Sequence, residues 1–169
     1  MELRAFNSDK DFERIKHWST DERIHAMWCA NRFQFPLEKE NFSETLETFS
    51  EKHGDAAYVA VLEGEPVGFF CYSFNAETKE GMLKFVIVDP ECRGKGIAKE
   101  MFTILLRHAF NDTEAEAVQL VVFPQNPRAK RFYEKMGFVE RRTEQGAFAY
   151  KDEFWDRCFM VIKKEGFHE

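Results

Sequence analysis

The chain has 169 residues, of which 44% are hydrophobic and 15% aromatic, and it carries a formal net charge of −6. This length suits one domain over residues 1–169 with a sizeable core. The acidic balance argues against a nucleic-acid-binding protein that works through a broad basic face. No apolar stretch approaches the roughly 20 residues that cross a bilayer. The charged N-terminus is unlike a secretory signal, so we expect a cytoplasmic protein without a membrane partner.

The four cysteines, Cys29, Cys71, Cys92 and Cys158, are scattered and form no C-x-x-C pair. A metal site or a disulfide framework is therefore not expected, and reduced thiols are the simplest interpretation. Cys92 lies beside the basic turn described below, but no histidine is near it in sequence, so we interpret it as an incidental thiol.

The N-terminal third predicts one strand and three helices. A short alternating stretch comes first, and apolar residues at helical spacing then follow polar capping residues. The expected elements are a strand over 2–6, a helix from Ser8 or Asp9 to about Trp18, a helix from Thr20 or Asp21 to about Ala30, and a helix from Pro36 to Gly54.

The central part predicts three consecutive strands, over 57–62, 67–74 and 82–88. They are separated by glycine-containing turns at 63–66 and 78–81. Because both connections are short, we expect the three strands to be antiparallel.

The most informative stretch is the basic turn after the third of these strands. The apolar run 85–88 is stopped by Asp89-Pro90, and a helical pattern begins at Ile97. Backbone N–H groups at a helix N-terminus lack intrahelical acceptors and carry the positive end of the helix dipole. Glycines let such a backbone approach a phosphate closely, and Arg93 and Lys95 add positive charge. The turn therefore predicts a pyrophosphate-binding site.

Two common phosphate loops do not fit this turn. A Walker loop would need Ser or Thr after Lys95, and a dinucleotide fingerprint would need a small residue in place of Lys99. A nucleotide-binding domain is therefore a remoter alternative. The turn instead resembles the acetyl-CoA motif Q/R-x-x-G-x-G/A of the Gcn5-related N-acetyltransferase (GNAT) family. Arg93, Gly96 and Ala98 occupy its three fixed positions.

A second segment resembles the same family further along the chain. A buried strand over 120–123 precedes a helix with Asn126 as its cap, Pro127 at its first position and Gly137 as its stop. Residues 126–138 resemble the family pattern N-x-x-A-x-x-F/L-Y-x-x-x-G-F. Two motifs in the family's order, on the expected elements, make the resemblance specific.

The whole order of elements predicts an α/β fold, an α+β mixed sheet flanked by helices. Two further strands are expected over 138–142 and 155–162, with a turn near Gln145-Gly146. The order resembles the GNAT acyl-CoA N-acyltransferase-like fold over nearly the whole chain, with a motif-bearing core of about 57–138. The N-terminal helices and the C-terminal hairpin are then expected to form the acceptor side.

The resemblance implies acetyl-CoA as the cosubstrate. In this family the strand before the phosphate turn carries a bulge and splays from the next parallel strand, so that its main chain binds the pantetheine arm. Val86, Ile87 and Val88 are thereby expected at the acetyl and pantetheine end, where a backbone N–H could stabilise the oxyanion. Asn126 either only caps its helix or also binds the cofactor or a water. Pyrophosphate contacts are expected from Arg93, Gly94, Lys95, Gly96, Ile97, Ala98 and Lys99.

Direct transfer needs a neutral amine and a proton for the departing CoA sulfur. The resemblance implies Tyr133 as the general acid, whereas its helical face alone would suggest a core residue. The general base stays open, because Val121 occupies the position at which some relatives have a glutamate. Glu80, Asp89 and Glu22 are candidates without further support.

The expected function is transfer of an acetyl group from acetyl-CoA directly to a primary amine of a small molecule or peptide. The aromatic and acidic stretch 17–28 suggests a cationic acceptor lined by Asp21 and Glu22, or else a packed helix face with a solvated acidic side. An alternative function is a non-catalytic acyl-CoA-binding or sensing module, which Val121 favours and Tyr133 and Asn126 disfavour. The acceptor and the oligomeric state stay open, with a homodimer as one alternative.

Overall fold

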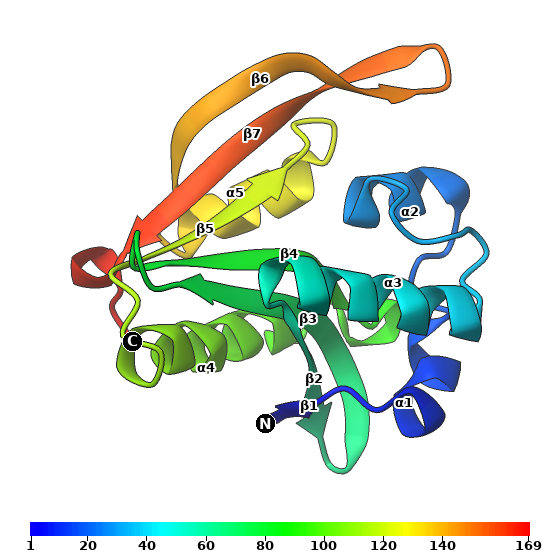
Figure 1. The fold of residues 1–169 in the computed structure, drawn as a ribbon, viewed down its shortest axis with the longest axis horizontal. Coiled ribbons are helices and arrows are strands. Elements are labelled where there is room, and N and C mark those ends of the chain that lie inside the picture. Colours follow the sequence, from blue (N-terminus) through cyan, green and yellow to red (C-terminus); the bar gives the residue numbers. More distant parts are fainter.

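Seven strands form one mixed sheet, and helices cover both of its faces in the computed structural model, which describes residues 1–169 (Figure 1). The strands are β1 (Glu2–Ala5), β2 (Ala56–Leu62), β3 (Glu65–Asn75), β4 (Glu80–Val88), β5 (Ala117–Val122), β6 (Val139–Tyr150) and β7 (Glu153–Lys163). The helices are α1 (Ser8–Ile15), α2 (Glu22–Cys29), α3 (Lys39–His53), α4 (Ile97–Asn111) and α5 (Pro127–Lys135), with 3-10 turns at Pro90–Cys92 and Lys164–Gly166.

The strand order is β1-β2-β3-β4-β5-β7-β6. All neighbouring strands are antiparallel except β4 and β5, which are parallel. The predicted mixed α/β fold and the predicted antiparallel order of the central three strands are therefore confirmed. None of the helices combines the length and the apolar character that a membrane crossing requires.

Each face of the sheet has its own hydrophobic core. One core lies under α4 and α5 and includes Phe102, Leu105 and Phe138. The other lies under α1, α2 and α3 and is rich in phenylalanine rings, among them Phe42 and Phe69, which are both fully buried. The many phenylalanines of the sequence therefore serve mainly to pack the helices onto the sheet.

Local capping signals fix where several helices begin. The Asp21 side chain accepts a hydrogen bond from the backbone of Ile24 at 2.8 Å, as predicted for the start of α2. The first helix differs from the prediction: Asn7 is its cap, since the Asn7 side chain accepts a hydrogen bond from the backbone of Lys10. The third helix begins at Lys39 rather than at Pro36, so the helical pattern starts later than the proline suggested.

The C-terminal hairpin turns later than predicted. Gly146, with φ +58°, lies inside β6 within an irregular segment between Glu144 and Phe148. Its N–H donates to the Asp156 carboxylate on β7 at 2.8 Å, so the hairpin continues past the glycine. The chain reverses instead at Lys151, which has φ +52°. The prediction of a turn near Gln145-Gly146 was wrong because a bulge can also take up a positive φ.

Candidate functional site

The centre of the sheet opens between the two parallel strands. β4 and β5 pair only over Glu80–Met82 and Ala117–Gln119, and no pairing follows beyond these residues. On the other side of β4 the register with β3 shifts by one residue, and Phe85 at this bulge has φ +54°. The bulge turns β4 away from β5, so main-chain groups of β4 are left without a strand partner. The predicted bulge and splay are both present.

This opening forms a cleft of about 760 Å³ with a mainly apolar lining. Almost all of the predicted site residues line it, although they come from four different segments. Lys95 is the exception, because its exposed side chain is absent from the lining. The predicted residues in the lining are Val86, Ile87, Val88, Arg93, Gly94, Gly96, Ile97, Ala98, Lys99, Asn126 and Tyr133.

The glycine-bearing turn forms part of the cleft wall. Gly94 and Gly96 have φ +78° and +79°, and a Cβ atom at either position would meet no atom within 4 Å. Gly96 is the N-cap of α4 and has no side chain to satisfy the first N–H groups of the helix. Those N–H groups are therefore available to an anion in an uncrowded space.

Positive charge gathers at the cleft in an otherwise acidic chain. Burial and, to a smaller extent, the neighbouring charge of Arg128 lower the pKa of the Arg93 guanidinium. Two guanidinium groups that repel each other in this way are suited to share an anion. No Asp or Glu belongs to the lining, whose charged side chains are Lys84, Arg93, Lys99, Arg128 and Lys135.

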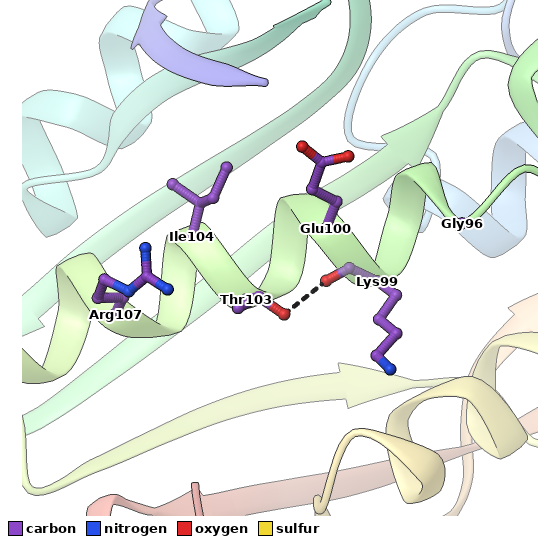
Figure 2. A pocket seen from close by; sticks show the side chains of 6 residues that line it. All are labelled: Gly96, Lys99, Glu100, Thr103, Ile104 and Arg107. Carbon is purple, nitrogen blue, oxygen red and sulfur yellow. Dashed lines mark hydrogen bonds between the residues drawn. The ribbon is translucent and has the colours of Figure 1, made fainter. Parts of the chain in front are cut away.

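A shallower hollow of about 470 Å³ lies on the outer face of α4 (Figure 2). Gly96 and Lys99 border both this hollow and the cleft. Figure 2 shows the Lys99 side chain extending away from Glu100 and Ile104, and the Thr103 hydroxyl donating to the Lys99 carbonyl at 2.9 Å. The glycine-bearing turn is thus open to solvent along this side of the helix.

Tyr133 is held on α5 by aromatic neighbours. Its ring lies 5.6 Å from that of Phe102 and 6.0 Å from that of Phe138. Burial raises the pKa of Tyr133 to about 12, with no contribution from a charged or hydrogen-bonding neighbour. The side chain lines the cleft and remains partly exposed. The hydroxyl is therefore protonated at neutral pH and free to donate.

The carboxylates considered as general bases are all engaged elsewhere. Glu80 pairs with Arg141 at 2.7 Å, and Asp89 is buried and pairs with Arg14 at 3.1 Å. Glu22 pairs with Lys151 at 3.3 Å.

Neither Asp21 nor Glu22 lines the cleft, so the acidic acceptor lining that they suggested is absent there. The sequence predicted the part of the cleft that holds the residues expected to bind the cofactor, but it did not predict the opposite wall. That wall is formed by residues whose only signal was the aromatic stretch 17–28 and the bulge in β4. They are Ile24, Met27, Trp28, Lys84 and Phe85, and we call this part of the cleft the acceptor half.

Comparison with known proteins agrees with this geometry. Residues 12–138 match the model of the acetyltransferase (GNAT) family. An uncharacterized N-acetyltransferase of SPbeta prophage origin from Bacillus subtilis is 28% identical over 133 residues, covering 78% of this chain and 75% of the relative. The aminoglycoside N(6')-acetyltransferase type 1 of Klebsiella pneumoniae is 26% identical over 148 residues, covering 80% and 73%.

A solved structure shows the same fold. The crystal structure of spermidine N-acetyltransferase from Vibrio cholerae, in complex with CoA and spermine, superposes with a TM-score of 0.80 at 23% identity. The match covers 98% of this chain and 96% of that one. Both this structural match and the match to the family model cover the opening between β4 and β5, the glycine-bearing turn and α5. The chain belongs to the acetyltransferase (GNAT) family.

Proposed function

We propose that this protein transfers an acetyl group from acetyl-CoA directly to a primary amine of a small molecule or peptide. The observation that carries the proposal is the opening between β4 and β5, with a glycine-bearing helix start at one end and the Tyr133 hydroxyl in its wall. Relatives that are named for acetyl transfer to aminoglycosides support an amine acceptor.

The residues of the cleft fit acetyl-CoA. Unpaired main-chain groups of Val86–Val88 offer hydrogen bonds to the pantetheine arm in the manner of an added strand. The uncrowded turn at Gly94 and Gly96 suits the pyrophosphate, and Arg93 and Lys99 supply the matching charge. Asn126 uses its side-chain oxygen to accept from Ala129 at 3.2 Å, so its amide N–H₂ remains available to the ligand.

When bound, acetyl-CoA supplies an activated acyl carbon. The neutral amine attacks that carbon, a C–N bond forms, and the C–S bond breaks. A backbone N–H of Val86–Val88 stabilises the negative charge that develops on the carbonyl oxygen. Tyr133 donates its proton toward the leaving sulfur, and the amine releases its extra proton to water, because no carboxylate lines the cleft.

The fold also suggests from which side each substrate enters. The phosphate turn and α5 bind the cosubstrate, and the acceptor half lies across the strands, against α2. We place the amine there. The four cysteines are all free, which is consistent with a cytoplasmic enzyme, and a homodimer stays part of the proposal.

A binding experiment on the glycine turn tests the proposal. Acetyl-CoA at about 100 times its Kd should stabilise the protein by about 2.7 kcal/mol and raise its Tm. Gly96→Asp should abolish this shift, since it places a carboxylate where a phosphate is expected. Gly96→Asn separates the charge from the added bulk and should retain part of the shift.

Gly54→Asp is the matched control. Gly54 has φ +70°, no atom lies within 4 Å of a Cβ built there, and it ends α3 outside the cleft lining. This variant should retain the full shift. Unchanged acetyl-CoA binding by folded Gly96→Asp protein would contradict the proposed cradle. A wild-type protein that binds acetyl-CoA but releases no free thiol with any amine would instead favour the acyl-CoA-sensing alternative.

A further inference from the structure

The face of β7 next to the acceptor half carries an arginine without a partner. Side chains alternate along a strand, so Trp155, Arg157 and Phe159 share one face. Phe159 pairs in register with Val121, which lines the cleft, and Trp155 packs with Ala26 of α2. Arg157 is not itself among the residues that line the cleft, but it lies beside the cleft wall, on the face of β7 between Phe159 and Trp155.

The guanidinium of Arg157 is not neutralised within the chain. Its Nε is buried and has no hydrogen-bond partner. Glu144 lies directly across on β6, but its carboxylate accepts from Arg142 instead. The Arg142 guanidinium in turn covers the Phe159 ring, 3.7 Å from its centroid. A buried donor without an acceptor is costly, so its persistence calls for a group that the protein alone does not supply.

A second donor without a partner lies across the cleft. The Nε1 atom of Trp28 is buried and unpaired, and Trp28 lines the acceptor half. The one cation that lines this half, Lys84, is already held by the buried Asp55 at 2.8 Å. The acceptor half thus has one buried N–H donor to satisfy, that of Trp28, and no acidic side chain in its lining, while the charged Arg157 donor lies on the neighbouring face of β7.

We propose that the acceptor is a small primary amine that also carries a carboxylate or phosphate group, and that Arg157 binds this acidic group. The inference rests on the proposed acetyl transfer and names the class of its acceptor. A guanidinium presents two parallel N–H groups that match a carboxylate or a phosphate. Such an acceptor would also offer an acceptor atom to the Trp28 indole N–H, whereas a polycation would meet no acidic side chain in the cleft lining.

The same charge pattern helps the chemistry. A bound ammonium group surrounded by positive charge and no carboxylate has its neutral form favoured, since like charges oppose protonation. The acidic group of the acceptor would anchor the molecule to Arg157 while its amine loses a proton to water. No carboxylate base is then needed, which agrees with the engagement of Glu80, Asp89 and Glu22 in ion pairs elsewhere.

Matched pairs of acceptors test this inference by their kcat/KM, measured from free-thiol release. The carboxylate series compares β-alanine and γ-aminobutyrate with the amino alcohols of equal chain length. The phosphate series compares phosphoethanolamine with ethanolamine, and linear diamines represent cationic acceptors. All rates are expressed per concentration of neutral amine. We expect at least one acidic series to exceed its neutral partners and the diamines by roughly 10-fold or more.

Arg157→Gln should raise the KM of the acidic acceptors by roughly 10–100-fold. The same variant should leave kcat, the acetyl-CoA Kd and the rates with neutral amines nearly unchanged. Arg157→Lys retains the positive charge but lacks the planar guanidinium, so it should give an intermediate KM. Because it keeps the charge, it also controls for a folding defect in Arg157→Gln. Lys52→Gln, at the exposed end of α3 outside the cleft lining, makes the same change in net charge and should have no effect.

The outcomes separate this inference from the proposed function. Turnover that is best with diamines or neutral amines, and equal in wild type and Arg157→Gln, would overturn the acidic acceptor while acetyl transfer stands. A protein that binds acetyl-CoA but acetylates no amine of any series would refute acetyl transfer, and the acidic acceptor with it.

Discussion

Tyr133 sits among apolar rings with a hydroxyl that has no hydrogen-bonding neighbour acting on it. Tyr133→Phe keeps the ring and its packing and removes only the proton. If the proton reaches the leaving sulfur, kcat should fall by roughly 10²–10⁴-fold while the acetyl-CoA Kd stays the same. Tyr58→Phe is a matched control, because Tyr58 stacks on Phe70 and does not line the cleft. Equal turnover by wild type and Tyr133→Phe would leave Tyr133 with a packing role.

The pH dependence of kcat follows from the same residue. The acid must be protonated to act, and burial raises the pKa of Tyr133 to about 12. The protonated fraction therefore stays near one over the ordinary assay range and falls only as the pH approaches that value. We expect kcat to rise with pH as the amine loses its proton, without a descending limb below about pH 10, the usual tyrosine pKa. A bell-shaped profile that descends below that pH would contradict the assignment.

Single residues were predictable where their signal is local. Asn126, Pro127 and the glycines before α4 act on their own helix starts, so their neighbours in sequence reveal them. Arg157 and Trp28 carry no such signal. The position of Trp28 in the cleft and that of Arg157 beside it depend on strand register and on a helix from the other end of the chain, which no local pattern specifies.

At the scale of elements, α2 is a short helix that must be held by its surroundings. It has only eight residues, too few to be stable alone. His25 anchors its middle: the ring Nε2 lies 2.8 Å from the Phe33 carbonyl, and Nδ1 lies 3.3 Å from the Ser19 hydroxyl. The neutral ring satisfies both contacts, with Nε2–H donating and Nδ1 accepting.

Burial lowers the pKa of His25 below its ordinary value. The unfolded chain therefore binds the proton more readily than the folded protein. The contribution of the neutral ring to stability is fully present above about pH 6.5 and is lost as the pH falls through the lowered folded value. The free energy of unfolding should decline there by up to about 1.4 kcal/mol per pH unit for this one proton.

Urea unfolding of wild type and His25→Gln at several pH values measures this slope. The variant should be less stable at neutral pH but show a flatter decline below about pH 6.5. His53→Gln removes an exposed histidine at the end of α3 and should retain the wild-type slope. Parallel slopes for wild type and His25→Gln would show that this histidine does not set the acid sensitivity.

Most helices and strands were predictable from the sequence. Apolar periodicity and caps located the central strands and α4, because both depend on spacing within one segment. The end of the C-terminal hairpin was misplaced because Gly146 marks a bulge, and glycine at positive φ is compatible with either a bulge or a turn. Which of the two forms is decided by the partner strand, where Asp156 accepts from the Gly146 N–H.

At the scale of the whole molecule, the acceptor half could not be predicted from the order of the elements along the chain. It joins α2 and the bulge of β4, which are distant in sequence, and the face of β7 that carries Arg157 lies beside it. The acidic residues 21 and 22 looked suited to line it, but they cap α2 and pair with the hairpin at Lys151. The sequence suggested an acidic lining, whereas the folded chain gives the cleft positively charged side chains and no acidic ones.

The sheet has a further consequence for dynamics, because it is continuous across its centre only through the three residue pairs that join β4 to β5. Strands β1 to β4 come from the first half of the chain and β5 to β7 from the second. A molecule that hydrogen-bonds to both strands would add main-chain links between two sequence-local units whose strands meet only at this short ladder. In hydrogen–deuterium exchange, gap-facing amides of residues 84–88 should exchange fast in the free protein and slow down with CoA. CoA should also slow the exchange of β5 amides on the other side of the gap, and it should leave the exchange of β1 amides unchanged. In Gly96→Asp, CoA should no longer slow exchange in either strand.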